Sequence, residues 1–303
     1  MQITSNLLMI KPVNFGFNQE TAVNNAFQVA GFEQLAQQNA AKEFDNFVEK
    51  LRNNGIDVTV VQDTPIPYTP DSIFPNNWIS FHQGNKICLY PMFAENRRQE
   101  RKENVIETIK QKFKINETTD FTLFENENKF LEGTGSMVLD RENNIAFACL
   151  SPRTDQEVFD DFCSKMNFKG VSFTALDDNG GKIYHTNVMM CVADKYAIVC
   201  LDVIKDAKER KLVSDSLINS GKEIIEITTQ QMNNFAGNML QVKNNSGVPF
   251  LVMSSCAFKS LSSEQIAKIK FYNEIIDSEL DTIEKNGGGS ARCMLAEIFL
   301  DRI

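Results

Sequence analysis

The pattern of apolar and polar positions alternates between helical and strand-like spacing along the whole chain. Apolar residues recur at helical spacing in the segments 35–51, 105–113 and 158–166. Short runs rich in β-branched and aromatic residues lie between and beyond them, at residues 57–61, 86–90, 144–150, 196–201, 224–227 and 249–253. This alternation of predicted strands and helices indicates an α/β protein.

Two helix starts carry a capping pattern. Thr154 followed by Glu157 predicts a capping box at the start of the helix over 158–166, and Ser262 with Gln265 predicts a second one for a later helix. Each pairs a hydroxyl residue with an acidic or amide residue three positions later.

The order of elements repeats along the chain. A strand, a short turn, a second strand, a helix and a third strand recur in about five units, which begin near residues 5, 70, 130, 183 and 235. The units share this pattern but negligible sequence identity. Five units of this ββαβ type are able to close into a ring with one central site. The alternative is a doubly wound sheet, although no glycine-rich phosphate loop opens a helix after a strand.

Composition narrows the class of protein. The 303 residues are 42% hydrophobic and 23% charged, which is typical of a globular protein with a large core. The net charge of −9 argues against nucleic acid or an anionic membrane surface as the main partner. The apolar run at residues 7–10 is too short for a signal peptide or a membrane span.

Cysteine and histidine usage points to a reducing compartment. The seven cysteines form no CxxC pair and show no metal-ligand spacing, so we expect a cytoplasmic protein with mostly inert, buried thiols. The only two histidines, His82 and His185, leave little scope for a metal site. His82 lies in a predicted hairpin tip and is not assigned a role.

Four polar clusters lie beside predicted strands. Each has a structural explanation when taken alone: a proline loop, a β-turn, a solvated strand edge or a buried thiol. A glycine-rich loop also allows a ligand to approach the backbone closely, and a thiol next to a cation suits a nucleophile, so both readings stay open for the last cluster. The clusters occupy residues 70–78, 131–136, 180–187 and 287–294.

Together, the clusters resemble the motifs of the guanidino-group-modifying enzymes of the pentein superfamily. Pro70-Asp71-Ser72-Ile73-Phe74 is similar to a motif of dimethylarginine hydrolases, and Leu131-Glu132-Gly133 resembles their glycine turn. The sequence of residues 287–294 resembles the nucleophile loop of arginine deiminases. The resemblance implies a five-bladed, pseudo-symmetric α/β propeller around a central active site. It also implies a single catalytic domain over residues 1–303.

The resemblance assigns three catalytic roles. Cys293 would be the nucleophile, His185 the general acid and base, and Glu132 the group that orients the imidazole. The chemistry fits, because an amidine or urea carbon is a poor electrophile that requires a thiolate to attack it and an acid to protonate the leaving nitrogen.

The resemblance also assigns substrate contacts. Arg97 and Arg153 match segments that bind the α-carboxylate in dimethylarginine hydrolases, and a guanidinium can hold a carboxylate bidentately. A solvated helix start is an equal explanation for Arg97. The other expected contacts are Asp71, Phe74, Asn76, Asn77, Asn187 and Arg292.

The chain departs from the family where aspartates would neutralise a guanidinium, because it has Asn77 and Asn187 there. One charge pair at 4 Å is worth roughly 4 kcal/mol at an effective dielectric of 20, so this loss disfavours a cation. Asparagine complements a neutral ureido group, which favours citrulline, hydrolysed to ornithine, CO2 and NH3. Alternatively, these asparagines are structural and Asp71 and Glu132 suffice for a cation.

Other functions remain as alternatives. The enzyme could be an arginine deiminase, a dimethylarginine hydrolase or an amidinotransferase, and a non-catalytic pentein binding protein is the reading from another class. The mechanism requires neither cofactor nor metal. We expect a small amino-acid substrate as partner; the sequence leaves open whether the chain forms a homo-oligomer.

Overall fold

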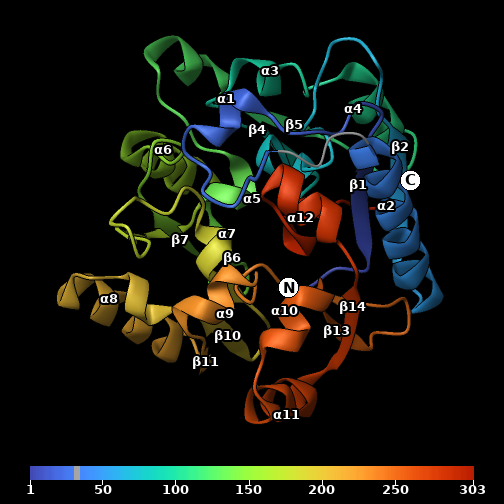
Figure 1. Cartoon of the computed structure of the whole chain (residues 1–303). Coiled ribbons are helices and arrows are strands. Elements are labelled where there is room, and N and C mark those ends of the chain that lie inside the picture. The colour runs from blue at the N-terminus through green and yellow to red at the C-terminus, as the bar shows by residue number, and fades with distance from the viewer. Residues whose placement is uncertain (31–34) are drawn as a thin grey trace.

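The computed structural model describes residues 1–30 and 35–303. Within these residues the chain forms five sheets of three strands each (Figure 1). They form a five-bladed α/β propeller, as expected. The sheets are β15 (Ala296–Glu297), β1 (Asn6–Lys11) and β2 (Asp57–Gln62); β3 (Ile79–His82), β4 (Lys86–Leu89) and β5 (Glu117–Asp120); β6 (Val138–Asp140), β7 (Ile145–Cys149) and β8 (Lys169–Phe173); β9 (Met190–Val192), β10 (Tyr196–Val199) and β11 (Glu223–Glu226); and β12 (Leu240–Lys243), β13 (Pro249–Ser254) and β14 (Glu274–Ser278).

Helices connect and cover these sheets. The α-helices are α1 (Gln19–Ala22), α2 (Ala36–Asn53), α3 (Glu95–Arg98), α4 (Glu103–Lys110), α5 (Gly133–Ser136), α6 (Gln156–Met166), α7 (Thr186–Met189), α8 (Ala207–Asn219), α9 (Thr229–Asn233), α10 (Ser255–Ser260), α11 (Ser263–Tyr272) and α12 (Asp281–Gly287). The 3-10 turns are η2 (Pro75–Asn77), η3 (Thr122–Glu127), η4 (Leu201–Val203) and η5 (Ala291–Met294). No helix in the described ranges is long and apolar enough to cross a membrane.

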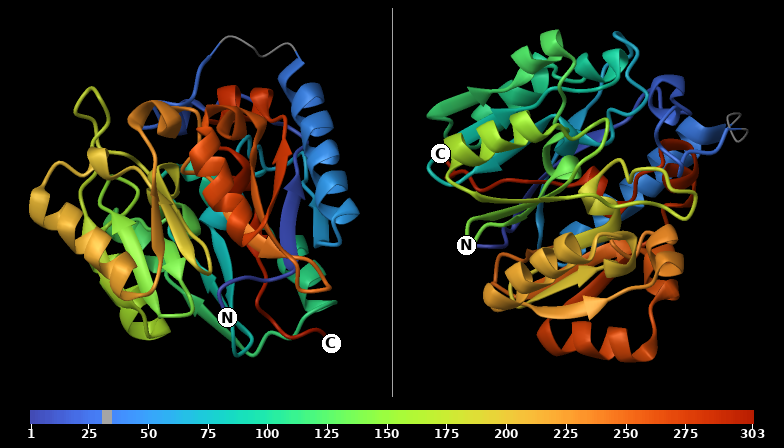
Figure 2. Two further views of the ribbon diagram at one scale, coloured as in Figure 1. Left: turned by 90° about the horizontal axis from the view of Figure 1, so that it is seen from below. Right: turned by 90° about the vertical axis from the view of Figure 1, so that its left-hand side faces the viewer.

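All five sheets share one topology. In each, the central strand pairs antiparallel with one neighbour and parallel with the other, as β4 does with β3 and β5. A parallel pair needs a crossover, and helices such as α4 supply it. The first sheet joins both ends of the chain, because β15 pairs with β1 in the register Leu8↔Ala296. Both termini accordingly lie on the same side of the molecule (Figure 2).

The longer helices lie at the periphery and bury one face each (Figures 1 and 2). Helix α2 is amphipathic and packs on β2, β14 and α12. Its buried residues are Ala36, Ala40, Phe44, Phe47, Val48 and Leu51. Leu35, which fits the same periodic pattern, lies just before the helix and is exposed.

The six predicted strand runs coincide with β2, β4, β7, β10, β11 and β13. The capping box predicted for Ser262 and Gln265 is present at α11. The one predicted for Thr154 was wrong, because Asp155 caps α6 by accepting hydrogen bonds from the amides of Glu157 and Val158. A carboxylate at the N-cap adds a favourable interaction with the helix dipole, which a threonine would lack.

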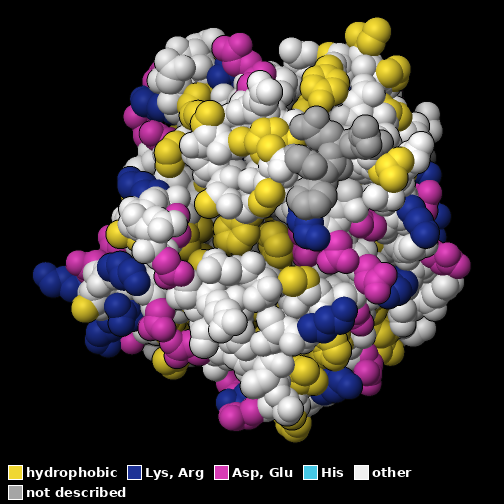
Figure 3. All heavy atoms as spheres, in the orientation of Figure 1, with side chains coloured by type: hydrophobic (Ala, Val, Ile, Leu, Met, Phe, Trp, Pro, Cys, Tyr) yellow, Lys and Arg dark blue, Asp and Glu magenta, His cyan; other side chains and the backbone are white. Residues whose placement is uncertain are grey.

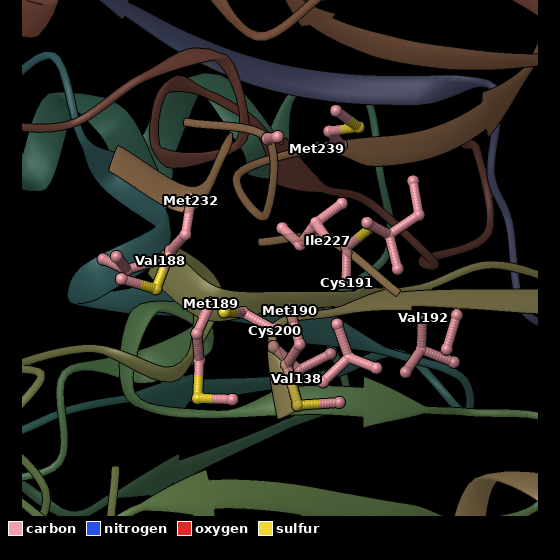
Figure 4. Close-up of a cluster of buried hydrophobic side chains, with 14 of the residues drawn as sticks. Val138, Val188, Met189, Met190, Cys191, Val192, Cys200, Ile227, Met232 and Met239 are labelled. Carbon is pink, nitrogen blue, oxygen red and sulfur yellow. The ribbon is translucent and has the colours of Figure 1, made fainter. Parts of the chain in front are cut away.

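Methionine, cysteine and β-branched side chains fill much of the core between the sheets (Figure 4). Burial raises the pKa of Cys191 and of Cys149 to about 12, so both remain protonated thiols. They behave as small hydrophobic residues, as the sequence predicted for most of the cysteines.

Candidate active site

In each sheet, the strand that pairs antiparallel with the central strand lies nearest the centre of the propeller: β15, β3, β6, β9 and β12. There, β3 contacts β15, and β9 contacts both β6 and β12. A short turn precedes each of them: η2, α5, α7, residues 235–239 and η5. The turns η2, α5, α7 and η5 pack against one another. This packing brings together five buried polar residues from distant parts of the sequence: Asn77, Glu132, His185, Asn238 and Cys293.

Glu132 and His185 form a buried pair. Nε2 of His185 lies 2.8 Å from Oε2 of Glu132, and the other carboxylate oxygen accepts a hydrogen bond from the Phe93 amide. When the imidazole is neutral, this contact places its proton on Nε2 and leaves a lone pair on Nδ1. The carboxylate therefore fixes both the tautomer and the orientation of the ring.

The charges of this pair follow from its surroundings. Burial alone would raise the pKa of Glu132, but the guanidinium of Arg153 and the hydrogen bond from His185 lower it well below its usual range. Burial lowers the pKa of His185 to about 4, although Glu132 partly opposes the shift. At neutral pH the closed site thus holds an ionised Glu132 and a neutral His185.

Cys293 lies in η5, with its sulfur facing two side-chain amides. Nδ2 of Asn238 is 3.2 Å from Sγ, and Nδ2 of Asn187 is 3.6 Å from it. The Asn238 amide is oriented by two backbone bonds, since its Oδ1 accepts from the Arg292 amide and its Nδ2 also donates to the Asn187 carbonyl. Two N–H donors directed at the sulfur are suited to stabilising negative charge on it.

Sequence reasoning missed Asn238. It is a single polar residue between apolar neighbours and lies in no cluster. The signal that could have found it is its position, because it precedes the first strand of the fifth repeated unit, as Asn77 precedes β3 in the second.

Arg97 holds the amide of Asn77 in one orientation. Nε and Nη2 of Arg97 donate to the two oxygens of Glu100, at 2.8 and 3.0 Å, and Nη1 donates to Oδ1 of Asn77 at 2.9 Å. All three side chains are at least 97% buried. Because Arg97 can only donate, Oδ1 of Asn77 must face it and Nδ2 must face the other way.

Several buried polar atoms around the central cavity have no hydrogen-bond partner among the described residues. They include Oδ1 of Asp71, Nδ2 of Asn77 and Oδ1 of Asn187. Leaving such atoms unpaired costs free energy, and in native proteins they commonly mark a place where a ligand or water binds. The site therefore offers one donor and two acceptors.

Glycine is required where these side chains approach the backbone. A Cβ on Gly135 would lie 2.3 Å from Nδ2 of Asn77 and 2.8 Å from Nδ1 of His185. A Cβ on Gly289 would contact the ring of Phe74 at 3.0 Å. The glycines of the second and fourth clusters thus make room for the site.

Residues 18–28 close the site from outside. Arg153 donates from Nη2 to the carbonyl of Thr21 and from Nε to Oδ1 of Asn24, at 2.7 and 2.8 Å. Thr21 and Asn18 both donate to Oδ2 of Asp71. The inner cavity between these groups holds only about 10 Å³, roughly the space of one water molecule. An amino acid can enter only if this segment moves.

A second, larger pocket lies on the outer side of the same segment. It has a volume of about 730 Å³ and shares Asn25 and Tyr184 with the inner cavity. The face seen in Figure 3 has a hollow near its centre with hydrophobic side chains at its floor. A path from solvent to the inner cavity past Tyr184 would begin in the outer pocket.

The structure brings most of the predicted site residues together. Glu132 lies behind His185, and Asn187 lies beside Cys293. Those that line the inner cavity are Asp71, Phe74, Asn77, Arg97, Arg153, His185 and Cys293.

Two of the expected contacts are directed elsewhere. The Asn76 side chain donates to Oγ1 of Thr134 and does not line the cavity. The guanidinium of Arg292 donates to the Leu295 carbonyl and to Glu297, which places it away from the cavity.

Comparisons with known proteins agree with this architecture. Residues 11–300 match the profile of a family described as N,N dimethylarginine dimethylhydrolase, eukaryotic. A sequence comparison with curated proteins gave no match.

Solved structures share the fold at low identity. An asparagine-to-serine variant of the N-terminal domain of ArgZ, covalently bound to a reaction intermediate, superposes with a TM-score of 0.77 at 16% identity over 97% of this chain and 98% of that chain. Complete ArgZ, an arginine dihydrolase from cyanobacteria, has a TM-score of 0.78 at 16% identity; the match covers 98% of this chain and 41% of ArgZ. A cysteine-to-serine variant of DDAH from Pseudomonas aeruginosa, complexed with citrulline, has a TM-score of 0.66 at 13% identity over 98% and 100% of the two chains.

Proposed function

The chain belongs to the N,N dimethylarginine dimethylhydrolase family of the pentein superfamily and is a C–N hydrolase, and from this premise we propose that it hydrolyses citrulline to ornithine, CO2 and NH3. In this proposal Cys293 is the nucleophile, His185 transfers protons and Glu132 orients the imidazole. Asn77 and Asn187 recognise the ureido group.

The observation that carries the proposal is the orientation of the Asn77 amide. Arg97 occupies its Oδ1, its Nδ2 is left without a hydrogen-bond partner, and Asn77 lines the inner cavity. A ureido group has a carbonyl oxygen that can accept this hydrogen bond, and its N–H groups can donate to Oδ1 of Asn187 and Oδ1 of Asp71. A guanidinium has only donors, so it would leave the Asn77 donor unpaired. Such a mismatch at a buried polar group disfavours the wrong ligand strongly.

Bond cleavage would begin with a proton transfer. Nδ1 of His185 takes the proton of the Cys293 thiol, and the resulting imidazolium is stabilised by the ionised Glu132. The thiolate attacks the ureido carbon, while Asn77 stabilises the negative charge that develops on the carbonyl oxygen. The imidazolium then protonates the side-chain nitrogen of the substrate. The C–N bond breaks, ornithine leaves, and Cys293 carries a carbamoyl group as a thioester-like intermediate.

Hydrolysis of the intermediate reverses these roles. His185, neutral again, takes a proton from water, whose oxygen attacks the carbamoyl carbon. The C–S bond breaks, the sulfur recovers a proton from the imidazolium, and carbamic acid leaves and decomposes to CO2 and NH3. Closure by residues 18–28 would exclude bulk water during the first half of the reaction.

Arg153 is the side chain best placed to bind the substrate α-carboxylate. Arg97 directs Nε and both terminal nitrogens at Glu100 and Asn77, so a carboxylate would have to displace buried bonds. The Arg153 guanidinium instead binds the closing segment, through Thr21 and Asn24. A substrate carboxylate could replace those contacts when the segment opens. In this arrangement Arg97 positions Asn77. Arg153 alone binds the α-carboxylate, a contact that the sequence predicted for Arg97 as well.

Arginine is the second candidate substrate, because one observation favours a cation. Asp71 presents a carboxylate oxygen without a hydrogen-bond partner among the described residues. Burial raises the pKa of Asp71, and Arg97 opposes this shift. Burial thus disfavours the charged form that a cation would require.

A direct assay separates the two substrates. The purified protein is incubated with citrulline and, separately, with arginine, and ornithine, citrulline and ammonia are quantified. We expect ornithine and ammonia in equal amounts from citrulline and at most a trace of product from arginine. Citrulline or ornithine formed from arginine, with no turnover of citrulline, would overturn the proposal.

The Arg97–Glu100 pair provides a second prediction. Glu100→Gln removes the charge that holds Arg97, so the Asn77 amide can turn and present either atom to the cavity. We expect kcat/KM for citrulline to fall about ten- to a hundredfold, the range for losing a hydrogen bond to a charged group. The ratio of citrulline to arginine turnover should fall with it. Glu125→Gln is the matched control, because Glu125 forms a bidentate pair with Arg101 outside the cavity. An equal effect of both variants would contradict the positioning role.

A further inference from the structure

Two buried arginines share one carboxylate on the side of the propeller axis away from Cys293. Nη2 of Arg292 lies 3.0 Å from Oε2 of Glu297, and Nη2 of Arg141 lies 3.8 Å from the same oxygen. All three side chains are only 8% exposed. The group therefore carries one positive charge more than its carboxylate can balance.

The other neighbours of Arg141 do not supply the missing negative charge. Its Nη1 lies 3.2 Å from Nδ1 of His82, and its guanidinium carbon lies 4.3 Å from the centre of the Phe299 ring. Burial, followed by the charge of Arg141, keeps the pKa of His82 well below its usual value, so this histidine is neutral. His82 in turn contacts Oγ of Ser80 at 2.7 Å. A ring and a neutral imidazole stabilise a cation only partly.

A cavity of about 210 Å³ lies against Arg141. It is at the ends of β3 and β6, whereas the candidate active site is at their beginnings. Lys86 and Lys165 also line it, as does Met1, whose ammonium group pairs with Glu142. Among the described residues, no aspartate or glutamate lines this cavity. The lysines are paired with acids that do not line the cavity: Glu117 and Asp161.

We propose that this cavity binds a compact oxyanion, of which inorganic phosphate is the simplest example, through the guanidinium of Arg141. A buried charge without a full partner is costly, and an anion beside Arg141 would balance it. The guanidinium has donors to spare, because its only hydrogen bond among the described residues is the contact with His82. Its planar fork matches the oxygens of phosphate or carboxylate better than a spherical ion. Lys86 and Lys165 would attract the anion to the entrance.

The site is linked to the catalytic side of the molecule through Glu297. An anion that binds Arg141 would leave Glu297 to pair with Arg292 alone. The backbone amide of Arg292 donates to Oδ1 of Asn238, and Nδ2 of Asn238 contacts the sulfur of Cys293. This chain of contacts gives the anion a physical route to the nucleophile turn.

Thermal unfolding of the intact protein tests the site. The midpoint is measured in inorganic phosphate and in sodium chloride at equal pH and ionic strength. Because a ligand that binds only the folded state stabilises it by mass action, we expect phosphate at about ten times its Kd to raise the midpoint by roughly 2 °C or more over chloride. No difference between phosphate and chloride would refute the proposal.

Three variants locate the effect. Arg141→Gln should abolish the phosphate response, whereas Glu297→Gln should increase it, because the buried positive charge then has no carboxylate at all. Arg302→Gln is the matched control, since Arg302 also lies over a phenylalanine ring but is exposed and paired with Asp57. A response that persists in Arg141→Gln would place the anion elsewhere, such as at Arg153. Should Arg141→Gln fail to fold, an unchanged or smaller response in Glu297→Gln would overturn the proposal.

Discussion

Cys293→Ser is expected to lower kcat for citrulline hydrolysis by about four to six orders of magnitude, the range measured when a catalytic nucleophile is removed. A hydroxyl is far less acidic than a thiol, and a neutral His185 whose pKa is lowered to about 4 is a weak base for it. The amides of Asn187 and Asn238 can stabilise a thiolate at their present distances, but they cannot create a nucleophile. Release of ornithine and ammonia is measured. Citrulline binding, measured by calorimetry, should be retained.

Cys256→Ser is the matched control for this variant. Cys256 is only half-buried, lies in α10 and does not line the inner cavity. The same exchange of sulfur for oxygen there should leave kcat within about twofold, as expected for a surface substitution. Turnover retained by Cys293→Ser would rule out covalent catalysis by this residue, whichever ureido or guanidino substrate is used.

The repeated order of strands and helices could be predicted from sequence because the central strands are apolar and four to six residues long. The strands β6, β9 and β15 have three, three and two residues, too few to show a period, and were not predicted individually. Their positions follow from the packing of the turns before them. The chain-closing pair of β1 with β15 joins residues almost 300 positions apart, which no local pattern can indicate.

The candidate site was likewise only partly predictable from the sequence. Residues in clusters beside strands, such as His185 and Cys293, could be singled out from local sequence. Glu100 and Asn24 could not, because their importance comes from contacts with Arg97 and Arg153 that form only in the folded chain. Arg292 shows the opposite case: its place beside Cys293 suggested a substrate contact, and in the structure its side chain lies against Glu297.

The selectivity expected from Asn77 yields the second large effect. In Asn77→Asp, one carboxylate oxygen would keep the bond to Arg97, and the other would replace the unpaired Nδ2 donor. That oxygen would repel the ureido carbonyl and attract a guanidinium. Arg97 cannot neutralise it fully, because Glu100 already binds this guanidinium bidentately.

We therefore expect Asn77→Asp to lower kcat/KM for citrulline at least a hundredfold and to raise turnover of arginine at least tenfold. A full charge pair at 4 Å corresponds to roughly 4 kcal/mol at an effective dielectric of 20, so these changes lie within its reach. Both substrates are assayed with the wild type and the variant. Asn76→Asp introduces the same charge one residue away, where the side chain contacts Thr134 and does not line the cavity. If arginine turnover rises in neither variant, or equally in both, charge at position 77 does not select the substrate. The neutral character of the site would then have to arise from Asn187 or from Asp71 in its protonated form.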